Sequence, residues 1–166
     1  MWRTFHKNVC VVLLTCAISV HLLAAPYADR IIIHKKARTL ELMHTGQVLK
    51  TYKIALGGEP VGPKTRQGDH HTPEGVYVID SRNAHSQFHR SLHISYPNAA
   101  DREHARKLGV TPGGDIFIHG LPNGYGFVGA AHRARDWTDG CVAVTDQEIE
   151  EIWAFVGNDT PVEIRP

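Results

Sequence analysis

The chain has 166 residues, a length that fits one domain of ordinary size. Its 18 basic and 17 acidic residues give a formal net charge of +1. Nucleic-acid binding usually needs a strongly basic surface, and this balance of charges does not indicate one. We therefore expect a partner that is uncharged or mixed in charge.

The first 25 residues have the three parts of a secretory signal. Arg3 and Lys7 come before any acidic residue, an apolar run covers residues 9–25, and Ala25 offers a cleavage site. Cleavage there would leave residues 26–166 as the mature domain. An uncleaved membrane anchor is the alternative, but the run is short for a span and contains His21. We expect an exported monomer in the periplasm or cell-wall space, attached to a membrane only if the leader stays uncleaved.

Short strands separated by turns dominate the rest of the sequence. Strands are predicted within residues 30–58, at 76–80, 88–96, 116–118 and 162–164. Residues 57–75 lack periodicity and predict a long loop, either functional or a disordered surface segment. Residues 120–136 contain four glycines and are expected to form a second loop. The fold class is mainly β (α+β), a barrel or sandwich with appended helices.

Two helices are predicted among these strands. Residues 99–108 have Ala and Leu at helical spacing, and Gly109 is suited to end that helix. Residues 145–148, Thr-Asp-Gln-Glu, form a capping box, in which Thr145 and Glu148 satisfy free N–H groups at a helix start. Apolar residues then recur at helical spacing, which predicts a second helix over residues 146–156.

Cys141 is the thiol that would remain after the leader, with Cys10 and Cys16, is removed. An unpaired cysteine in an exported protein is buried and inert, paired with another chain, or reactive. His119, at the end of a predicted strand, can take the proton of the thiol. Gly140 lets the backbone turn sharply, so that N–H groups of Gly140 and Cys141 can face a substrate carbonyl. These parts predict acyl transfer.

The loop before Cys141 offers further site residues, each with an alternative role. Arg133 and Arg135 can hold a substrate carboxylate by paired hydrogen bonds, or they can belong to a solvated loop and pair with Asp136. Trp137 can form a wall of the cleft or part of the core. Tyr125 and Phe127, placed among glycines, can line a mobile lid.

The sequence resembles the YkuD-type L,D-transpeptidases, which remodel bacterial peptidoglycan. The matching motifs are His119-Gly120, Thr138-Asp139-Gly140-Cys141-Val142 and, upstream, Gly68-Asp69 and Thr72-Pro73-Glu74-Gly75. The resemblance covers residues 30–166 and implies a YkuD-like β-barrel or sandwich that needs no metal or cofactor.

The same resemblance implies roles for individual residues. Cys141 would attack the carbonyl between diaminopimelate and D-alanine in a tetrapeptide stem and expel D-alanine. His119 would be the base, oriented by the carbonyl of Gly120, and the N–H groups of Gly140 and Cys141 would bind the oxyanion. The acceptor would be an amine, from another stem peptide or a lysine on a wall-anchored lipoprotein, or else water, as in a carboxypeptidase or amidase. The sequence leaves that choice open.

Two positions depart from the pattern of the family. Asp139 stands where many members have histidine, and Ala143 stands where many have arginine or asparagine. We expect Thr138 and Asp139 to contact the substrate. A carboxylate this close to the thiol would tend to raise its pKa, so Asp139 puts the tuning of Cys141 in question.

The sequence leaves two other hypotheses for the function of the chain. A sortase also has histidine before cysteine, but it needs an arginine close behind the cysteine strand, and here only Arg165 follows. A non-catalytic module that binds metal or the cell wall is suggested by His85, His89 and His93, whose spacing of four would align them on a helix. His93, however, lies in a segment that reads as a strand.

Overall fold

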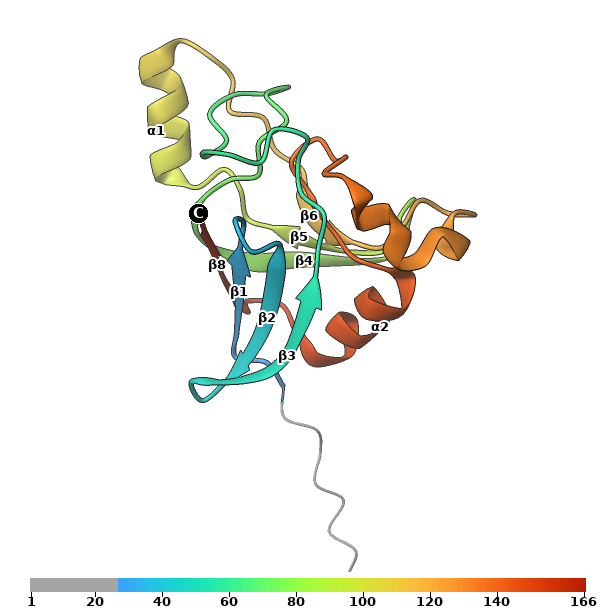
Figure 1. Ribbon diagram of the computed structural model, residues 1–166. Coiled ribbons are helices and arrows are strands. Elements are labelled where there is room, and N and C mark those ends of the chain that lie inside the picture. Colours follow the sequence, from blue (N-terminus) through green and yellow to red (C-terminus); the bar gives the residue numbers. More distant parts are fainter. Residues whose placement is uncertain (1–26) are drawn as a thin grey trace, which may run out of the picture.

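The structure, a computed structural model, describes residues 27–166, so the predicted signal lies outside the described residues. Within this range the chain forms one eight-stranded sheet in the order β3-β2-β1-β8-β4-β5-β6-β7, which curls around a core (Figure 1). The strands are β1 (Arg30–His34), β2 (Thr39–His44), β3 (Gln47–Lys53), β4 (Gly75–Ser86), β5 (His89–Ile94), β6 (Ile116–His119), β7 (Val142–Ala143) and β8 (Pro161–Arg165). The mainly β fold class is confirmed.

Strand β4 connects the two halves of the sheet. Its first residues, 75–78, pair with β8, and from Ile79 onward it pairs with β5. The register between β4 and β5 shifts twice, and such bulges bend a strand and increase its twist. The bulges also interrupt the alternation of apolar and polar residues, which is why the sequence predicts this strand only over residues 76–80.

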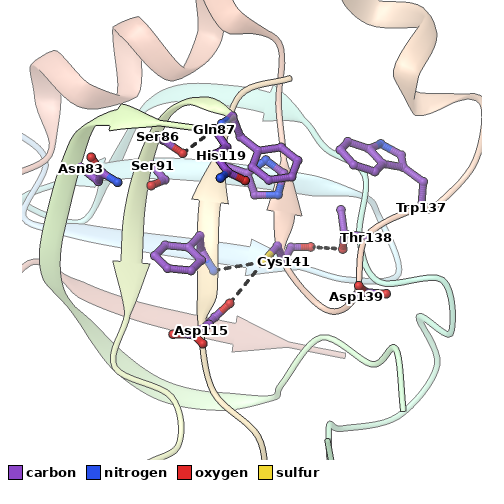
Figure 2. Close-up of a pocket in the computed structure, with 12 residues that line it drawn as sticks. Asn83, Ser86, Gln87, Ser91, Asp115, His119, Trp137, Thr138, Asp139 and Cys141 are labelled. Atoms are coloured by element: carbon purple, nitrogen blue, oxygen red, sulfur yellow. Dashed lines mark hydrogen bonds between the residues drawn. The ribbon is translucent and has the colours of Figure 1, made fainter. Parts of the chain in front are cut away.

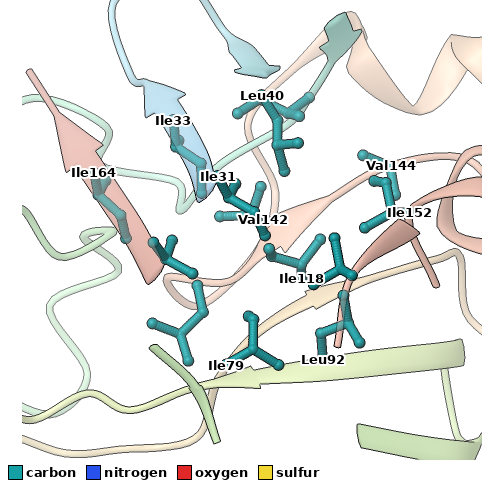
Figure 3. Close-up of a cluster of buried hydrophobic side chains, with 14 of the residues drawn as sticks. Ile31, Ile33, Leu40, Ile79, Leu92, Ile118, Val142, Val144, Ile152 and Ile164 are labelled. Atoms are coloured by element: carbon teal, nitrogen blue, oxygen red, sulfur yellow. The ribbon is translucent and has the colours of Figure 1, made fainter. Parts of the chain in front are cut away.

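The core fills the concave side of the curled sheet. Isoleucine, leucine and valine side chains from both halves of the sheet meet there and are almost fully buried (Figure 3): Ile31, Ile33, Leu40, Ile79, Leu92, Ile118, Val142, Val144, Ile152 and Ile164. Burial of such side chains contributes roughly 1.5–3 kcal/mol each. Ile118 and Val142 belong to this set, so the core fixes β6, which carries His119, and β7, which begins directly after Cys141.

Both predicted helices are present. Helix α1 (Ala99–Leu108) ends at Gly109, which is left-handed with a φ of 68°. Helix α2 (Asp146–Phe155) begins with the predicted capping box of Thr145 and Glu148. Ile149 and Ile152 are buried, and α2 packs against β5 and β6. No helix within residues 27–166 has the length and apolar character to cross a membrane.

The prediction that residues 120–136 form a loop is wrong in part. The segment η1 (Gly126–Ala134) has 3₁₀ turns, interrupted at Gly129, where φ is 49° and ψ is −137°. The glycines of this segment suggested a loop. In the structure Gly129 separates two tight turns, because glycine adopts the positive φ at the break without strain.

The long loop before β4 is held by two buried lysines. The Lys35 ammonium donates to the Thr72 carbonyl at 2.9 Å and to Glu74 Oε1 at 2.8 Å. The Lys64 ammonium and the Asp69 carboxylate form an ion pair at 2.8 Å with side chains only 4 % and 6 % exposed. Hydrogen bonds from Lys64 and from backbone N–H groups hold the pKa of Asp69 well below its usual range. This loop is therefore a fixed wall, not a disordered segment.

Candidate active site

The pairing of β6 with β7 places His119 and Cys141 on the same face of the sheet. These strands are parallel, with Ile118 opposite Val142 and His119 opposite Ala143. Ile118 and Val142 point into the core, and side chains alternate along a strand. Phe117, His119 and Cys141 therefore project from the other face. Figure 2 shows His119 and Cys141 on this face.

Cys141 lies between two hollows. The first has a volume of about 440 Å³ and is lined by both His119 and Cys141, with Phe88, Phe117 and Trp137 among its walls. The second, of about 350 Å³, reaches Cys141 from the side of the long loop and is lined by Lys64, Gln67, His70, Asp115 and Asp139, among others. A substrate carbonyl above the sulfur would have room on either side.

His119 is fixed in one orientation. Its Nδ1–H donates to the carbonyl of Gly120 at 2.7 Å, which assigns the proton to Nδ1 and leaves Nε2 as the basic nitrogen. The Phe88 ring lies 4.6 Å from the imidazole and the Trp137 ring 5.9 Å, between centroids. The residue is 4 % exposed, and this burial lowers the pKa of His119 to about 4. At neutral pH the imidazole is an uncharged base.

Gly120 must be small. A Cβ at this position would lie 2.8 Å from Asp146 Oδ1 and 3.1 Å from both His89 and Ile149. The close contact with α2 therefore explains why the residue after His119, at the end of β6, is glycine.

The thiol of Cys141 is held by the neighbouring strand. The N–H of Phe117 donates to Sγ at 3.4 Å, and the thiol donates to the Asp115 carbonyl at 3.5 Å (Figure 2). Burial raises the pKa of Cys141 to about 11, and the charges of Asp139 and Asp115 add to the effect, whereas the Phe117 N–H opposes it. The resting pair is therefore a neutral thiol beside a neutral imidazole.

A tight turn presents Cys141. The Thr138 hydroxyl donates to the Cys141 carbonyl at 2.7 Å and accepts the N–H of Gly140 at 3.2 Å. Gly140 has a φ of 122°, and a Cβ there would lie 2.5 Å from the His71 carbonyl oxygen. Only glycine fits this position, and the long loop packs directly against it.

Asp139 lies at the surface of the second hollow. Its side chain is 89 % exposed, and Oδ1 accepts a hydrogen bond from His70 Nδ1 at 2.7 Å. The carboxylate is therefore bonded to His70, while its charge is still felt at the sulfur.

The other predicted residues divide into two groups. Thr138, Asp139 and Trp137 line the first hollow with Cys141. Arg133, Arg135 and Tyr125 are absent from both hollows that reach Cys141. Arg133 pairs with Glu148, and Tyr125 stacks on Phe127 at 6.2 Å between centroids. The alternative in which the two arginines pair with Asp136 is wrong, because Arg38 holds Asp136 at 2.8 Å.

Several residues of the first hollow were not predicted. Phe88, Asn83 and Ser91 come from β4, β5 and the turn between them, and no local signal in the sequence reveals that β5 pairs with β6. The sequence did contain a signal for Phe117. Side chains two positions apart in a strand lie on the same face, so a strand here places Phe117 on the face of His119.

The histidines considered for a metal site are dispersed. His85 is in β4 and His89 and His93 are in β5, so they are not aligned on a helix. His89 contacts Glu150 at 2.8 Å, and His93 contacts Asp80. Within residues 27–166, no three or more His, Cys, Asp or Glu side chains are grouped as metal ligands.

Similarity to known proteins shows the family of this chain. Residues 28–164 match the family model of the L,D-transpeptidase catalytic domain, YkuD. The chain is 35 % identical over 131 residues to YafK of Escherichia coli (strain K12), a candidate L,D-transpeptidase, covering 75 % of this chain and 45 % of that protein.

Solved structures share the fold. The helical cell shape determining protein Pgp2 of Campylobacter jejuni superposes with a TM-score of 0.61 at 24 % identity, over 81 % of this chain and 46 % of that one. An L,D-transpeptidase of Xylanimonas cellulosilytica gives a TM-score of 0.53 at 15 % identity, over 84 % of this chain and 61 % of that one. The chain thus spans less than half the length of YafK and of Pgp2.

Proposed function

The chain belongs to the L,D-transpeptidase catalytic domain family, and we propose that it forms a thioester between Cys141 and a peptidoglycan tetrapeptide stem and transfers the acyl group to an amine. The observation that supports this most is that His119 and Cys141 line one hollow, with the Nδ1–H of His119 fixed on the Gly120 carbonyl. The basic Nε2 is then the nitrogen available to the thiol.

In the first half-reaction, Sγ of Cys141 attacks the carbonyl between diaminopimelate and D-alanine. The thiol proton passes to Nε2 of His119 as the S–C bond forms. The N–H of Cys141 binds the oxyanion, joined by that of Gly140 as it exchanges its bond with Thr138 for one to the substrate. The C–N bond then breaks, and His119 returns the proton to the amine of D-alanine.

In the second half-reaction, an amine attacks the thioester. His119 takes a proton from that amine, the C–S bond breaks, and the thiolate recovers the proton. Attack by water in place of the amine would give hydrolysis by the same steps. Because burial disfavours both charged forms, the proton moves during attack and no stable thiolate–imidazolium pair precedes it.

This function places the protein outside the cytoplasm. Peptidoglycan stems are the proposed substrates, and another stem or a lysine on a wall-anchored lipoprotein is the proposed amine acceptor. The predicted signal at residues 1–25 agrees with a periplasmic or cell-wall location. A role in cell shape, as in the name of Pgp2, would follow from such remodelling.

Mass spectrometry of the purified protein tests the nucleophile. A carbapenem, whose strained amide acylates nucleophiles, is expected to add its mass to Cys141, and Cys141→Ala should stay unmodified. Incubation with disaccharide-tetrapeptide should give cross-linked dimers if an amine is the acceptor and only tripeptides if water is.

Two outcomes would contradict the assignment. Full activity of Cys141→Ala on muropeptides would exclude the thiol mechanism. Stoichiometric zinc in the active protein, with activity lost on chelation, would do the same. The matched control is Ser81→Ala, a single-atom deletion on β4 outside both hollows that reach Cys141, which should acylate at the normal rate.

A further inference from the structure

A third hollow, which we call the Trp137 groove, adjoins the active site. It has a volume of about 480 Å³, and its walls come from the segment after His119 and from η1: Leu121, Pro122, Tyr125, Val128, His132 and Arg135 line it together with Trp137. Trp137 also lines the hollow of Cys141 and packs against His119, so the groove begins on the histidine side of the site (Figure 2).

One wall of the groove is the buried ring of His132. His132 is 8 % exposed, and its Nδ1 accepts the indole N–H of Trp137 at 3.3 Å. Burial and the charge of Arg133 lower the pKa of His132, so the ring is neutral and its proton belongs on Nε2. Within residues 27–166 this Nε2 has no hydrogen-bond partner. This nitrogen has almost no accessible surface, so His132 is part of the groove wall and its Nε2 is out of reach of a ligand in the groove.

The groove also has an unpaired cation at its edge. Arg135 is exposed and, within residues 27–166, makes no ion pair, whereas the nearby Arg133 and Arg38 are held by Glu148 and Asp136. Arg135 lines a further hollow with Lys36 and Lys53, which are also without ion pairs among the described residues. The field at this end of the groove is therefore positive, although the whole chain is close to neutral.

We propose that the Trp137 groove binds an acidic peptide that carries the attacking amine, with a free carboxylate of the peptide on Arg135. This inference rests on the proposed function and specifies its acceptor.

The position of the groove selects the acceptor over the donor. His119 has to take a proton from the attacking amine, so that amine must arrive on the histidine side of Cys141. The groove opens on that side, past Trp137. Asp115 and Asp139 line both hollows that reach Cys141, whereas the lining of the Trp137 groove contains Arg135 and no carboxylate, so an acidic peptide is favoured in the groove. Arginine pairs with a carboxylate through two parallel hydrogen bonds, which gives direction as well as affinity.

Acyl transfer to matched acceptors tests the proposal. The donor is the disaccharide-tetrapeptide, and the acceptors are one short peptide amine with free carboxylates and the same peptide with those carboxylates amidated. Arg135→Gln should lower kcat/KM for the free-carboxylate acceptor about 10- to 100-fold, mainly through KM, as expected for loss of a charged hydrogen bond. Transfer to the amidated acceptor and formation of the Cys141 acyl-enzyme should not change. Arg135→Lys should recover part of the loss.

A binding measurement separates this inference from the proposed function. In Cys141→Ala, titration calorimetry with the free-carboxylate peptide should show binding that weakens with added salt and is lost in the double variant with Arg135→Gln. The control is Arg30→Gln, an exposed arginine of β1 that lines none of these hollows. Equal effects of Arg135→Gln on both acceptors, no effect on either, or hydrolysis alone by an acylated wild-type protein would each overturn the inference. If the wild-type protein forms no acyl-enzyme at all, the proposed function fails, and peptide binding alone decides whether the groove is a site.

Discussion

His70 Nδ1 and Asp139 Oδ1 lie 2.7 Å apart, at the surface of the hollow that reaches Cys141 from the long loop. This contact joins residues 57–74 to the turn that presents the thiol. Neither arginine of the preceding loop contacts Asp139, because Arg133 pairs with Glu148 and Arg135 lies at the Trp137 groove. His70 is the basic group that contacts this carboxylate.

Replacement of Asp139 by Asn should make Cys141 more reactive. The pKa of the thiol is raised to about 11 mainly by burial, and the charge of Asp139 raises it further. Without that charge the thiolate fraction at pH 8 should rise, and alkylation by iodoacetamide should be about two- to fivefold faster. The increase is small because Asp139 is exposed and water screens its charge.

Asp159→Asn is the control for this variant. Asp159 is an exposed carboxylate with positive φ, which asparagine tolerates, and it lines none of the hollows near Cys141. Its alkylation rate should equal that of the wild type. An unchanged rate in Asp139→Asn would show that the carboxylate has no electrostatic effect on the sulfur.

Acidification should destabilise the fold through His119. The pKa of this residue falls from its model-peptide value of 6.5 to about 4 on folding, so between these values the unfolded chain binds more protons. Stability is therefore fully present above pH 6.5 and decreases as the pH falls to about 4, by about 3 kcal/mol at 1.36 kcal/mol per unit.

Urea unfolding at pH 7, 5.5 and 4.5 measures this loss. In His119→Asn, whose amide can still donate to the Gly120 carbonyl, the decrease should be smaller by most of that amount. The residual slope belongs to His132, Glu148 and Asp69, whose pKa values are also lowered in the folded protein. A wild-type protein with the same stability at pH 7 and 4.5 would contradict the buried neutral state of His119.

Local signals in the sequence predicted the parts of the fold that depend on neighbours along the chain. The capping box of Thr145 and Glu148 and the left-handed Gly109 are contacts within one turn of helix, so α1 and α2 are found at the expected residues. The sequence offered His119 and Cys141 as a pair, and the resemblance to the family implied their roles, but only the structure shows that both line one hollow.

Contacts between distant segments were beyond the reach of those signals. Arg38 and Asp136 are 98 positions apart, and their ion pair excludes the pairing expected within the loop 133–136. Phe88 reaches His119 only because β5 pairs with β6. The buried ammonium of Lys35 was missed for the same reason, since a lysine in a turn is ordinarily exposed.

Gly140→Ala should damage both stability and the site. The φ of 122° is strained for alanine, and the new Cβ would lie 2.5 Å from the His71 carbonyl oxygen. We expect a loss of about 2–4 kcal/mol in the free energy of unfolding and acylation by a carbapenem at least tenfold slower. Gly157→Ala, at a glycine with no atom within 4 Å of the added Cβ, should lose less than about 1 kcal/mol and acylate normally. Normal acylation of Gly140→Ala would show that the turn yields without moving the thiol.

Lys35→Met should loosen the long loop that packs on Gly140. The side chain is 2 % exposed, and its ammonium binds the Thr72 carbonyl and Glu74. Methionine keeps the apolar volume but leaves these groups without their cation, at a cost of about 3–5 kcal/mol for a broken buried ion pair. Limited proteolysis should then cut within residues 57–74 before the rest of the domain, and acylation of Cys141 should slow as the His71 carbonyl withdraws from Gly140.

Lys107→Met, at an exposed position of α1, should leave both stability and cleavage pattern unchanged. If the protease cuts Lys35→Met elsewhere before it cuts residues 57–74, and if acylation stays normal, Lys35 does not hold the loop. The Lys64–Asp69 ion pair alone would then hold this wall of the active site.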